Sequence, residues 1–507
     1  MFRTEYNGCK TSGCDNLGNP DLNLYTPSTR LGYPAYYCPK CGAYPPKLLN
    51  QPICALTRYI HQQRSTATSK FTLQCRCPGQ SQSQSQSQSR TQDQPRIKAQ
   101  WKRYDKTRIG TQRLKCSQCH TVASLTNPNK LASSLQPLLD LLVSGCPPSE
   151  LLPRSGWNKK LFYQRLNTLS QLLEVASHTY EQHWLTRQNS LSLHTHSHIV
   201  RCRSGLTRSK HHGLDCWLLT TNDSQTGYQF LISDNLLPNT SSNNHNGEYT
   251  LDEVEQPISP SLDVLTTAKH TYQKIMSRQQ FDKLAYCTKE HAKSNEGTLL
   301  RPVYAAHAHM QNLRLRLPDS IDIDLVLEHE SFIRGAAITA FSEQVKQNHT
   351  DGKVNLYYLH AFRCNEPPSS QPATPSSKRT LSWWHEKWYQ FPHRYQNENW
   401  LLGLGVLTQT SSAKKTTLQS TVPTRPDWHS HFWHHFDAWL PSSHRQKISH
   451  GQLILWISIF RYLYNFSGAY LENKENQAKL NEKEYLEWHS VKQLVHWIEV
   501  YTLSIQK

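Results

Sequence analysis

The sequence lacks any long apolar run, and its first ten residues lack an apolar core. No uninterrupted stretch of about 18 apolar residues, the length that a membrane-spanning helix needs, occurs in its 507 residues. The longest apolar segment, residues 453–466, is interrupted by Ser458, Arg461 and Asn465, which predicts a buried helix. The first residues, MFRTEYNGCK, contain no apolar core. We therefore expect a cytoplasmic protein with no membrane partner.

Acidic residues are scarce relative to basic ones. There are 38 Asp and Glu against 56 Lys and Arg, which gives a formal net charge of +18 and a pI near 9.3. Each neutralised phosphate releases counterions, so this imbalance favours a polyanionic partner, with nucleic acid the first candidate. The alternative is a basic but inert surface. The length and the 36% hydrophobic content suit a globular protein of about two to four domains.

Fourteen cysteines are present, and nine of them lie before residue 120. Disulfides are rare in a reducing cytosol, so closely spaced pairs indicate metal ligands. Two four-cysteine sets have the spacing of zinc ribbons. We expect each to hold one structural zinc ion, which would give a short segment the folding energy that its small core lacks. The alternative is reduced cysteines buried for packing. The first set is Cys9, Cys14, Cys38 and Cys41, and the second is Cys75, Cys77, Cys116 and Cys119.

The second set is the less regular. Only Arg76 separates Cys75 from Cys77, which is tight for two ligands of one metal, and Cys54, His61 or His120 could replace one of them. Positive charge gathers around this set, with ten Lys and Arg against two Asp between residues 90 and 130. This pattern predicts DNA phosphate contacts, and its alternative is a solvated basic loop. The predicted contact residues here are Lys102, Arg103, Lys106, Arg108 and Arg113.

Apolar residues then return at helical spacing between residues 131 and 177, which predicts three helices. Ser149 is expected to cap the second helix, and Gly156 to Asn158 to provide the turn and cap before the third. The third helix would present Lys159, Lys160 and Arg165 to DNA, as in a helix-turn-helix. Ordinary helical packing is the alternative.

Three segments, CKTSGC, GYPAYYCPKCG and GTQRLKCSQCHTVASL, followed by this helical region, resemble bacterial insertion-sequence transposases. The resemblance implies an RNase H-like domain in which three acidic residues hold two divalent metals for DNA cleavage and strand transfer. The expected fold is α/β and multidomain, with a mixed five-stranded sheet and flanking helices. Its strands are expected near residues 191–202, 214–223, 228–235, 321–328 and 353–362. The expected domains are residues 1–125 (zinc ribbons, with a disordered Gln/Ser insert at 80–89), 126–185 (helix-turn-helix), 186–470 (RNase H-like) and 471–507 (helical extension).

The sequence departs from this family where the first metal-binding acid should lie. No Asp or Glu occurs between Glu181 and Asp215, and the first strand carries three alternating histidines instead. These histidines, His194, His196 and His198, could bind a transition metal or form the wet face of a half-exposed strand. Asp215, Glu328 and Asp437 are the candidate catalytic residues, with Glu330, Glu386 and Glu398 as substitutes.

The sequence thus predicts a transposase-like protein that binds double-stranded DNA and has lost catalysis. One alternative is an active, magnesium-dependent recombinase in which the three carboxylates hold the metal. A second alternative is an RNA-binding or structural zinc protein. Self-association and a role in a mobile element are left open.

Overall fold

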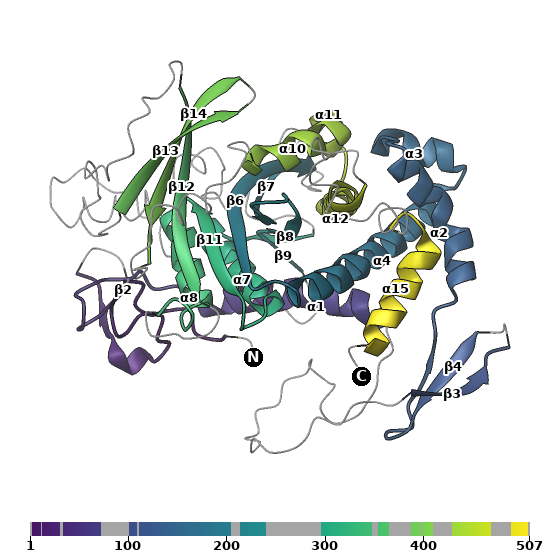
Figure 1. The fold of residues 1–507 in the computed structure, drawn as a ribbon, viewed down its shortest axis with the longest axis horizontal. Helices are drawn as coiled ribbons and strands as arrows, with labels where there is room; N and C mark the ends of the chain where they lie inside the picture. The colour runs from purple at the N-terminus through teal and green to yellow at the C-terminus, as the bar shows by residue number, and fades with distance from the viewer. Residues whose placement is uncertain are drawn as a thin grey trace. The chain divides into compact units, whose positions relative to one another are not determined.

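The computed structural model describes residues 3–11, 13–30, 34–71, 101–108, 111–203, 213–239, 296–346, 353–364, 387–395, 397–408, 428–467 and 488–504 (Figure 1). The chain divides into two compact units. The first comprises Met1–His61 and Leu185–Ile454, and the second comprises Gln62–Trp184 and Leu455–Lys507. The Gln/Ser tract at 80–89 lies outside the described residues. None of the described helices is long and apolar enough to cross a membrane.

A seven-stranded mixed sheet organises the first unit. Its strands run in the order β13-β14-β12-β11-β6-β7-β8. β6, β7 and β8 form an antiparallel meander, β11 is parallel to β6, and β12 is parallel to β11. β14 and β13 then extend the β12 edge in antiparallel fashion. The strands are β6 (Ser190–Arg203), β7 (Gly213–Asp223), β8 (Gln229–Asp234), β11 (Asp322–Glu328), β12 (Val354–Cys364), β13 (Lys387–Tyr395) and β14 (Glu398–Val406).

The five strands expected from the sequence correspond to β6, β7, β8, β11 and β12, which are adjacent in the sheet. The expectation of only five strands was wrong, because the hairpin β13–β14 adds two more. Asn397, in the short connection of this hairpin, has a φ of 62°. Asparagine tolerates this left-handed conformation better than most residues, which suits it to a tight hairpin turn.

Helices cover both faces of the sheet. On one face, Trp217 of β7 packs against Phe332 of α8, with ring centroids 5.9 Å apart. On the other, His198 of β6 stacks on Trp433 of α10 at 4.5 Å. Because Trp217 lies opposite Ile199 in the β6–β7 register, it shares the face that His198 does not. The flanking elements are α7 (Pro302–Arg316), α8 (Ser331–Ala340), α10 (Trp428–Trp439), α11 (Ser442–Arg445) and the small pair β9 (Leu236–Pro238) and β10 (Gly297–Leu299).

The N-terminal segment of the first unit carries η1 (Leu22–Leu24), β1 (Thr26–Ser28) and β2 (Ala35–Tyr37), and then enters α1 (Asn50–Phe71). It is tied to the sheet's helices by hydrogen bonds. The Arg3 guanidinium donates to the Thr339 carbonyl (2.7 Å) and to the Gly18 carbonyl (2.7 Å). Asn312 of α7 donates to the Thr57 carbonyl at 3.2 Å. The segment is therefore an integral part of the first unit.

The second unit is mostly helical, and the three helices expected from periodicity are present. α3 begins at Pro148 after an N-cap at Pro147, so the expected cap at Ser149 was wrong. Gly156 ends α3 with a φ of 66°, and Asn158 accepts from the Leu161 amide at the start of α4. The elements are β3 (Trp101–Lys106), β4 (Gln112–Cys116), β5 (Val122–Ser124), α2 (Pro128–Val143), α3 (Pro148–Ser155), α4 (Lys159–Leu185) and α15 (Val491–Ser504), with α12 (His450–Phe466) crossing from the first unit.

A buried ion-pair network and an aromatic cluster hold the helices of this unit together. Arg461 of α12 donates to Glu174 (2.6 Å) and Glu181 (3.3 Å) of α4. The rings of Phe466 and Trp488 stack at 4.5 Å, and the Gln136 side chain accepts from the Val491 amide. The C-terminal helix α15 therefore packs on α2.

Candidate metal centre

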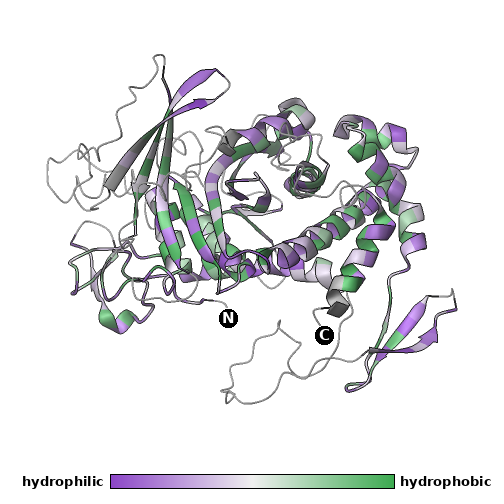
Figure 2. Ribbon diagram, viewed as in Figure 1, coloured by the Kyte–Doolittle hydropathy of each residue, from purple (hydrophilic) through white to green (hydrophobic). Residues whose placement is uncertain are grey.

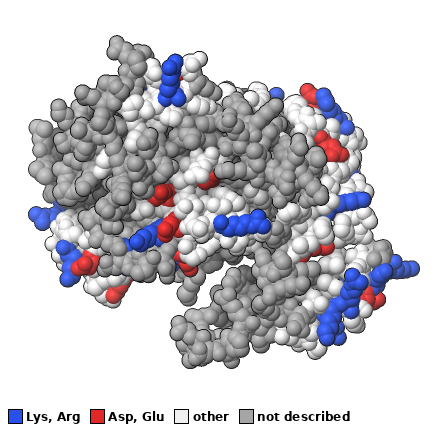
Figure 3. Space-filling model, in the orientation of Figure 1, with Lys and Arg blue, Asp and Glu red and all other residues white. Residues whose placement is uncertain are grey.

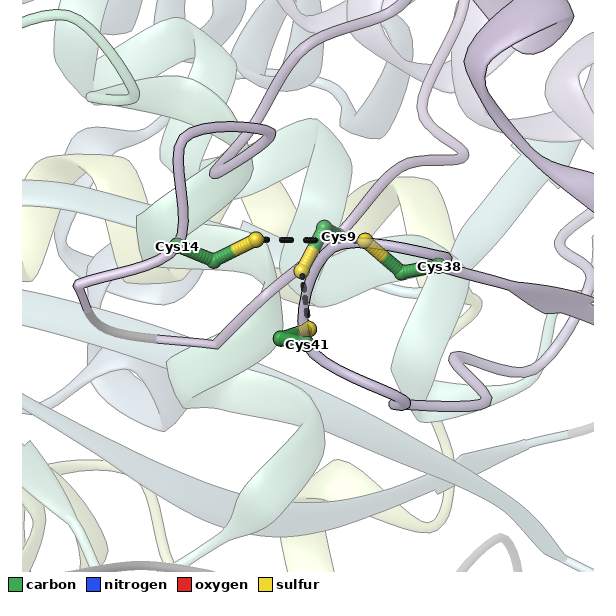
Figure 4. Close-up of side chains that lie close together, drawn as sticks. All are labelled: Cys9, Cys14, Cys38 and Cys41. Atoms are coloured by element: carbon green, nitrogen blue, oxygen red, sulfur yellow. Dashed lines mark hydrogen bonds between the residues drawn. The ribbon is translucent and has the colours of Figure 1, made fainter.

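Four cysteines from two turns of the N-terminal segment point their sulfurs at a common centre (Figure 4). The Sγ atoms of Cys9 and Cys41 are 3.4 Å apart, and those of Cys14 and Cys38 are 3.8 Å apart. All four sulfurs lie within 4.8 Å of one another. A tetrahedral zinc ion with Zn–S bonds of about 2.3 Å requires S···S separations of about 3.8 Å. The cluster can therefore hold a metal ion such as zinc, as the sequence predicted for this set.

Local backbone structure positions these thiols. Gly42, with a φ of 74°, allows the turn after Cys41, in which the Gly42 amide donates to the Cys38 carbonyl at 2.8 Å. The amide of Thr11 lies 3.5 Å from the Cys9 sulfur, and Asn16 Nδ2 lies 3.6 Å from the Cys38 sulfur. Such N–H donors stabilise negative charge on the sulfurs and so favour the thiolate form that binds metal.

Without a bound metal, burial disfavours the thiolate forms of Cys9 and Cys14. It raises the pKa of Cys14 to about 11, and it raises the pKa of Cys9 further. At Cys38 burial also disfavours the thiolate, but hydrogen bonds from the Cys41 and Lys40 amides and from the Cys41 and Asn16 side chains together outweigh it and lower the pKa. A bound cation would compensate the buried negative charge, so metal binding should release protons and weaken in acid.

The second cysteine set is only half described. Cys116 ends β4, and Cys119 lies in the turn that follows, where the His120 amide donates to the Cys116 carbonyl at 3.1 Å. Trp101 packs against this pair. Cys75 and Cys77 lie outside the described residues, so the second zinc site stays a prediction. The two sets belong to different compact units, because Cys116 and Cys119 fall in the second.

The basic residues expected to contact DNA lie mostly on exposed surface. Figure 3 shows Lys and Arg gathered over the β3–β4 hairpin, which Figure 2 shows as mainly hydrophilic. Arg113 is half-buried on β4. On α4, Arg165 stacks its guanidinium 4.0 Å from the centre of the Trp157 ring. The exposed members of the set are Lys102, Arg103, Lys106, Arg108, Lys159 and Lys160.

Lys115 is a basic residue of the same hairpin that sequence reasoning missed. It lies directly opposite Lys102 in the β3–β4 register, and its Nζ is 5.2 Å from the centre of the exposed Tyr104 ring. Leu114 and Cys116, on the alternate positions of β4, are buried. Lys102, Arg113 and Lys115 therefore share the face opposite the buried one. The alternation Arg113, Leu114, Lys115, Cys116 was the available signal.

The three candidate catalytic carboxylates each have a different partner. Asp215 of β7 makes two hydrogen bonds of 2.6 Å with the Arg201 guanidinium, and Asp437 of α10 pairs with Arg445. Glu328, at the end of β11, accepts from the amide (2.8 Å) and hydroxyl (2.6 Å) of Ser197.

In the part of the chain that the structure describes, the thiol cluster is the one group of three or more candidate ligands whose atoms converge. Asp215, Glu328 and Asp437 are thus not brought together. Of the substitutes, Glu398 pairs with Arg363, Glu330 is the residue directly before α8, and Glu386 lies outside the described residues.

The histidines of β6 are not on a wet face. His194 and His196 are 4% and 3% exposed, and His198 is half-buried against Trp433. The interpretation of β6 as a half-exposed strand was therefore wrong, because α10 covers the face on which these residues lie. The structure does not group the three as ligands of a common metal.

Comparison of the chain with models of known protein families, with curated proteins and with solved structures finds no match in any of the three.

Proposed function

We propose that this protein binds double-stranded DNA as a transposase-like protein, with zinc in a structural role and without a working three-carboxylate site. The observation that carries the proposal is the cationic face of the β3–β4 hairpin. Lys102 and Lys115 stand directly opposite each other there, an arrangement of like charges that destabilises a free sheet. A phosphate bound between them would relieve this repulsion, which supports a polyanionic partner.

The aromatic ring beside these lysines supports the same proposal. Tyr104 is 56% exposed, which is unusual for a residue of its size, and it lies beside Lys115. Exposed Lys102, Arg103, Lys106 and Arg108 surround it. Cationic groups around a solvent-facing aromatic ring suit contact with a sugar–phosphate backbone. Contacts of this kind give affinity rather than sequence specificity.

The sheet of the first unit supports the transposase-like scaffold. In chain order, β6, β7, β8, β11 and β12 are strands one to five, and they lie side by side in the order 3-2-1-4-5. The first three are antiparallel, and the fourth and fifth run parallel to the first. This arrangement agrees with an RNase H-like core. The four thiols near the N-terminus would hold a structural zinc, which neutralises their charge and fixes the two turns.

Loss of catalysis is supported by the surroundings of Glu328, which lies at the end of β11 beside the middle of β6. There the strand neighbouring Glu328 offers the amide and hydroxyl of Ser197 and the buried ring of His196, rather than a second carboxylate. Magnesium prefers several oxygen ligands at one centre. We therefore propose that Glu328 has a structural role as a hydrogen-bond acceptor.

DNA binding across a salt series tests the proposal. For the double variant Lys102→Ala/Lys115→Ala, the slope of log K against log salt should fall by about 2, because each lost phosphate contact removes about 0.9 from it. The control Lys353→Ala/Lys447→Ala removes the same charge from exposed positions in the other unit and should bind as the parent protein does. An unchanged slope in the hairpin variant would refute the DNA surface. Nicking of DNA in magnesium or manganese that Glu328→Gln abolishes would establish the recombinase instead.

A further inference from the structure

Two histidines on helix α10 hold their ring nitrogens close together. The Nε2 atoms of His431 and His435 are 3.2 Å apart, and their ring planes meet at 69° with centroids separated by 4.5 Å. Residues four apart lie on the same side of a helix. A tetrahedral metal with M–N bonds of about 2.0 Å places two ligand nitrogens about 3.3 Å apart. The two imidazoles are thus already spaced as two corners of a metal site.

The surroundings of the pair make this spacing rigid. Phe432, Trp433 and Phe436, on the adjacent side of α10, are at most 1% exposed and anchor the helix in the core of the first unit. His431 is 6% exposed, whereas His435 is half-buried. The pair therefore lies at the border of the buried face. Packing holds the His431 ring, and the His435 ring is in part accessible to solvent.

The chemistry of the pair selects the class of ion. Neutral imidazole suits zinc, nickel, cobalt and copper, and it is a poor ligand for magnesium or calcium, which take oxygen ligands. A single Nε2–H···Nε2 hydrogen bond would also bring the rings this close. A metal ion can bind both Nε2 atoms once the donor ring carries its proton on Nδ1 instead, which frees the second lone pair. A metal titration therefore decides between a metal site and a hydrogen bond alone.

We propose that His431 and His435 form a further metal site, in which the two Nε2 atoms bind one divalent transition-metal ion and water fills the remaining positions. With two neutral ligands in place of four thiolates, this site is weaker than the cysteine cluster and exchanges its metal. It is separate in ligand type and in sequence from both cysteine sets.

Calorimetric titration of the full chain, first loaded with zinc at its thiol sites, with Ni²⁺ tests this proposal. The parent protein should bind one additional equivalent, and His435→Ala should bind it about a hundredfold more weakly, because it loses the second arm of a chelate. His434→Ala is the matched control, since His434 is the neighbouring, exposed histidine of the same helix and should leave binding unchanged.

A second measurement keeps the proposal falsifiable if a variant folds poorly. Crystals of the parent protein soaked in Zn²⁺ should show an anomalous peak about 2 Å from both Nε2 atoms. The proposal is overturned if His435→Ala binds Ni²⁺ as tightly as the parent and His434→Ala proteins do. It is equally overturned if soaked crystals show zinc at the thiols and none between these histidines.

Discussion

His309 of α7 should make the protein progressively less stable in mild acid. Its ring is completely buried, with Nε2 2.8 Å from the Thr221 hydroxyl and Nδ1 2.7 Å from the Ser233 hydroxyl. Burial, with a smaller contribution from Arg316, lowers the pKa of His309 from 6.5 to about 3. The folded chain thus keeps this ring neutral, whereas the unfolded chain takes up a proton below pH 6.5. Stability is complete above that pH and is lost as the pH falls towards 3.

The size of this loss follows from proton linkage. Each pH unit below the unfolded pKa costs about 1.4 kcal/mol, so His309 alone should reduce the free energy of unfolding by about 2 kcal/mol between pH 7 and pH 5. Burial lowers the pKa of His307 as well, so the absolute loss includes both residues. Comparison with His309→Gln isolates one of them, because the variant keeps a polar side chain that does not titrate.

Urea unfolding followed by circular dichroism at pH 7 and pH 5 measures the effect. Between the two pH values the parent protein should lose about 2 kcal/mol more than His309→Gln does. The exposed His434→Gln should lose as much as the parent. Equal losses in the parent and His309→Gln would show that the buried ring takes up a proton without cost, which would refute the reasoning.

Two further predictions concern the metal cluster and the second unit. Cys38→Ser should lower the zinc content by one equivalent, whereas Cys146→Ser, which belongs to neither cysteine set, should not. Elemental analysis measures the zinc content, and an unchanged content in Cys38→Ser would exclude the cluster. Arg461→Met should lower the free energy of unfolding by about 3 kcal/mol, because it leaves the buried Glu181 with less compensating charge. Arg154→Met, in an exposed pair, should cost under about 1 kcal/mol. Similar costs in urea unfolding would contradict this account.

The sequence predicted those features whose residues lie close together in the chain. The thiols of the first set were identified because both pairs lie on short turns within about thirty residues. The strands β6 and β11 were identified because their apolar residues form continuous or alternating runs. β13 was missed because Pro392 interrupts its run, which argues against a strand. The positions of the candidate carboxylates relative to one another could not be foreseen, because each lies on a different element.

The errors at β6 and at the hairpin have a related origin. Alternating histidines predict one face of a strand, but whether that face is wet depends on a helix some 230 residues later in the chain. The location of Lys115 opposite Lys102 depends on the register of the hairpin, which shifts at a bulge between Arg103 and Asp105. Neither covering helices nor registers can be read from periodicity alone.

During synthesis the N-terminal segment can form its local contacts well before its long-range ones. Its four thiols are complete once residue 41 has been made, whereas the partner of Arg3, Thr339, lies 336 residues further on. At about 5–20 residues per second, the segment waits roughly 15 to 60 seconds after residue 41 before that partner is made. A metal held by local thiolates would preserve its shape throughout this delay. If the cluster takes up zinc, we expect the metal supply during translation, and not only afterwards, to affect how much chain reaches the native state.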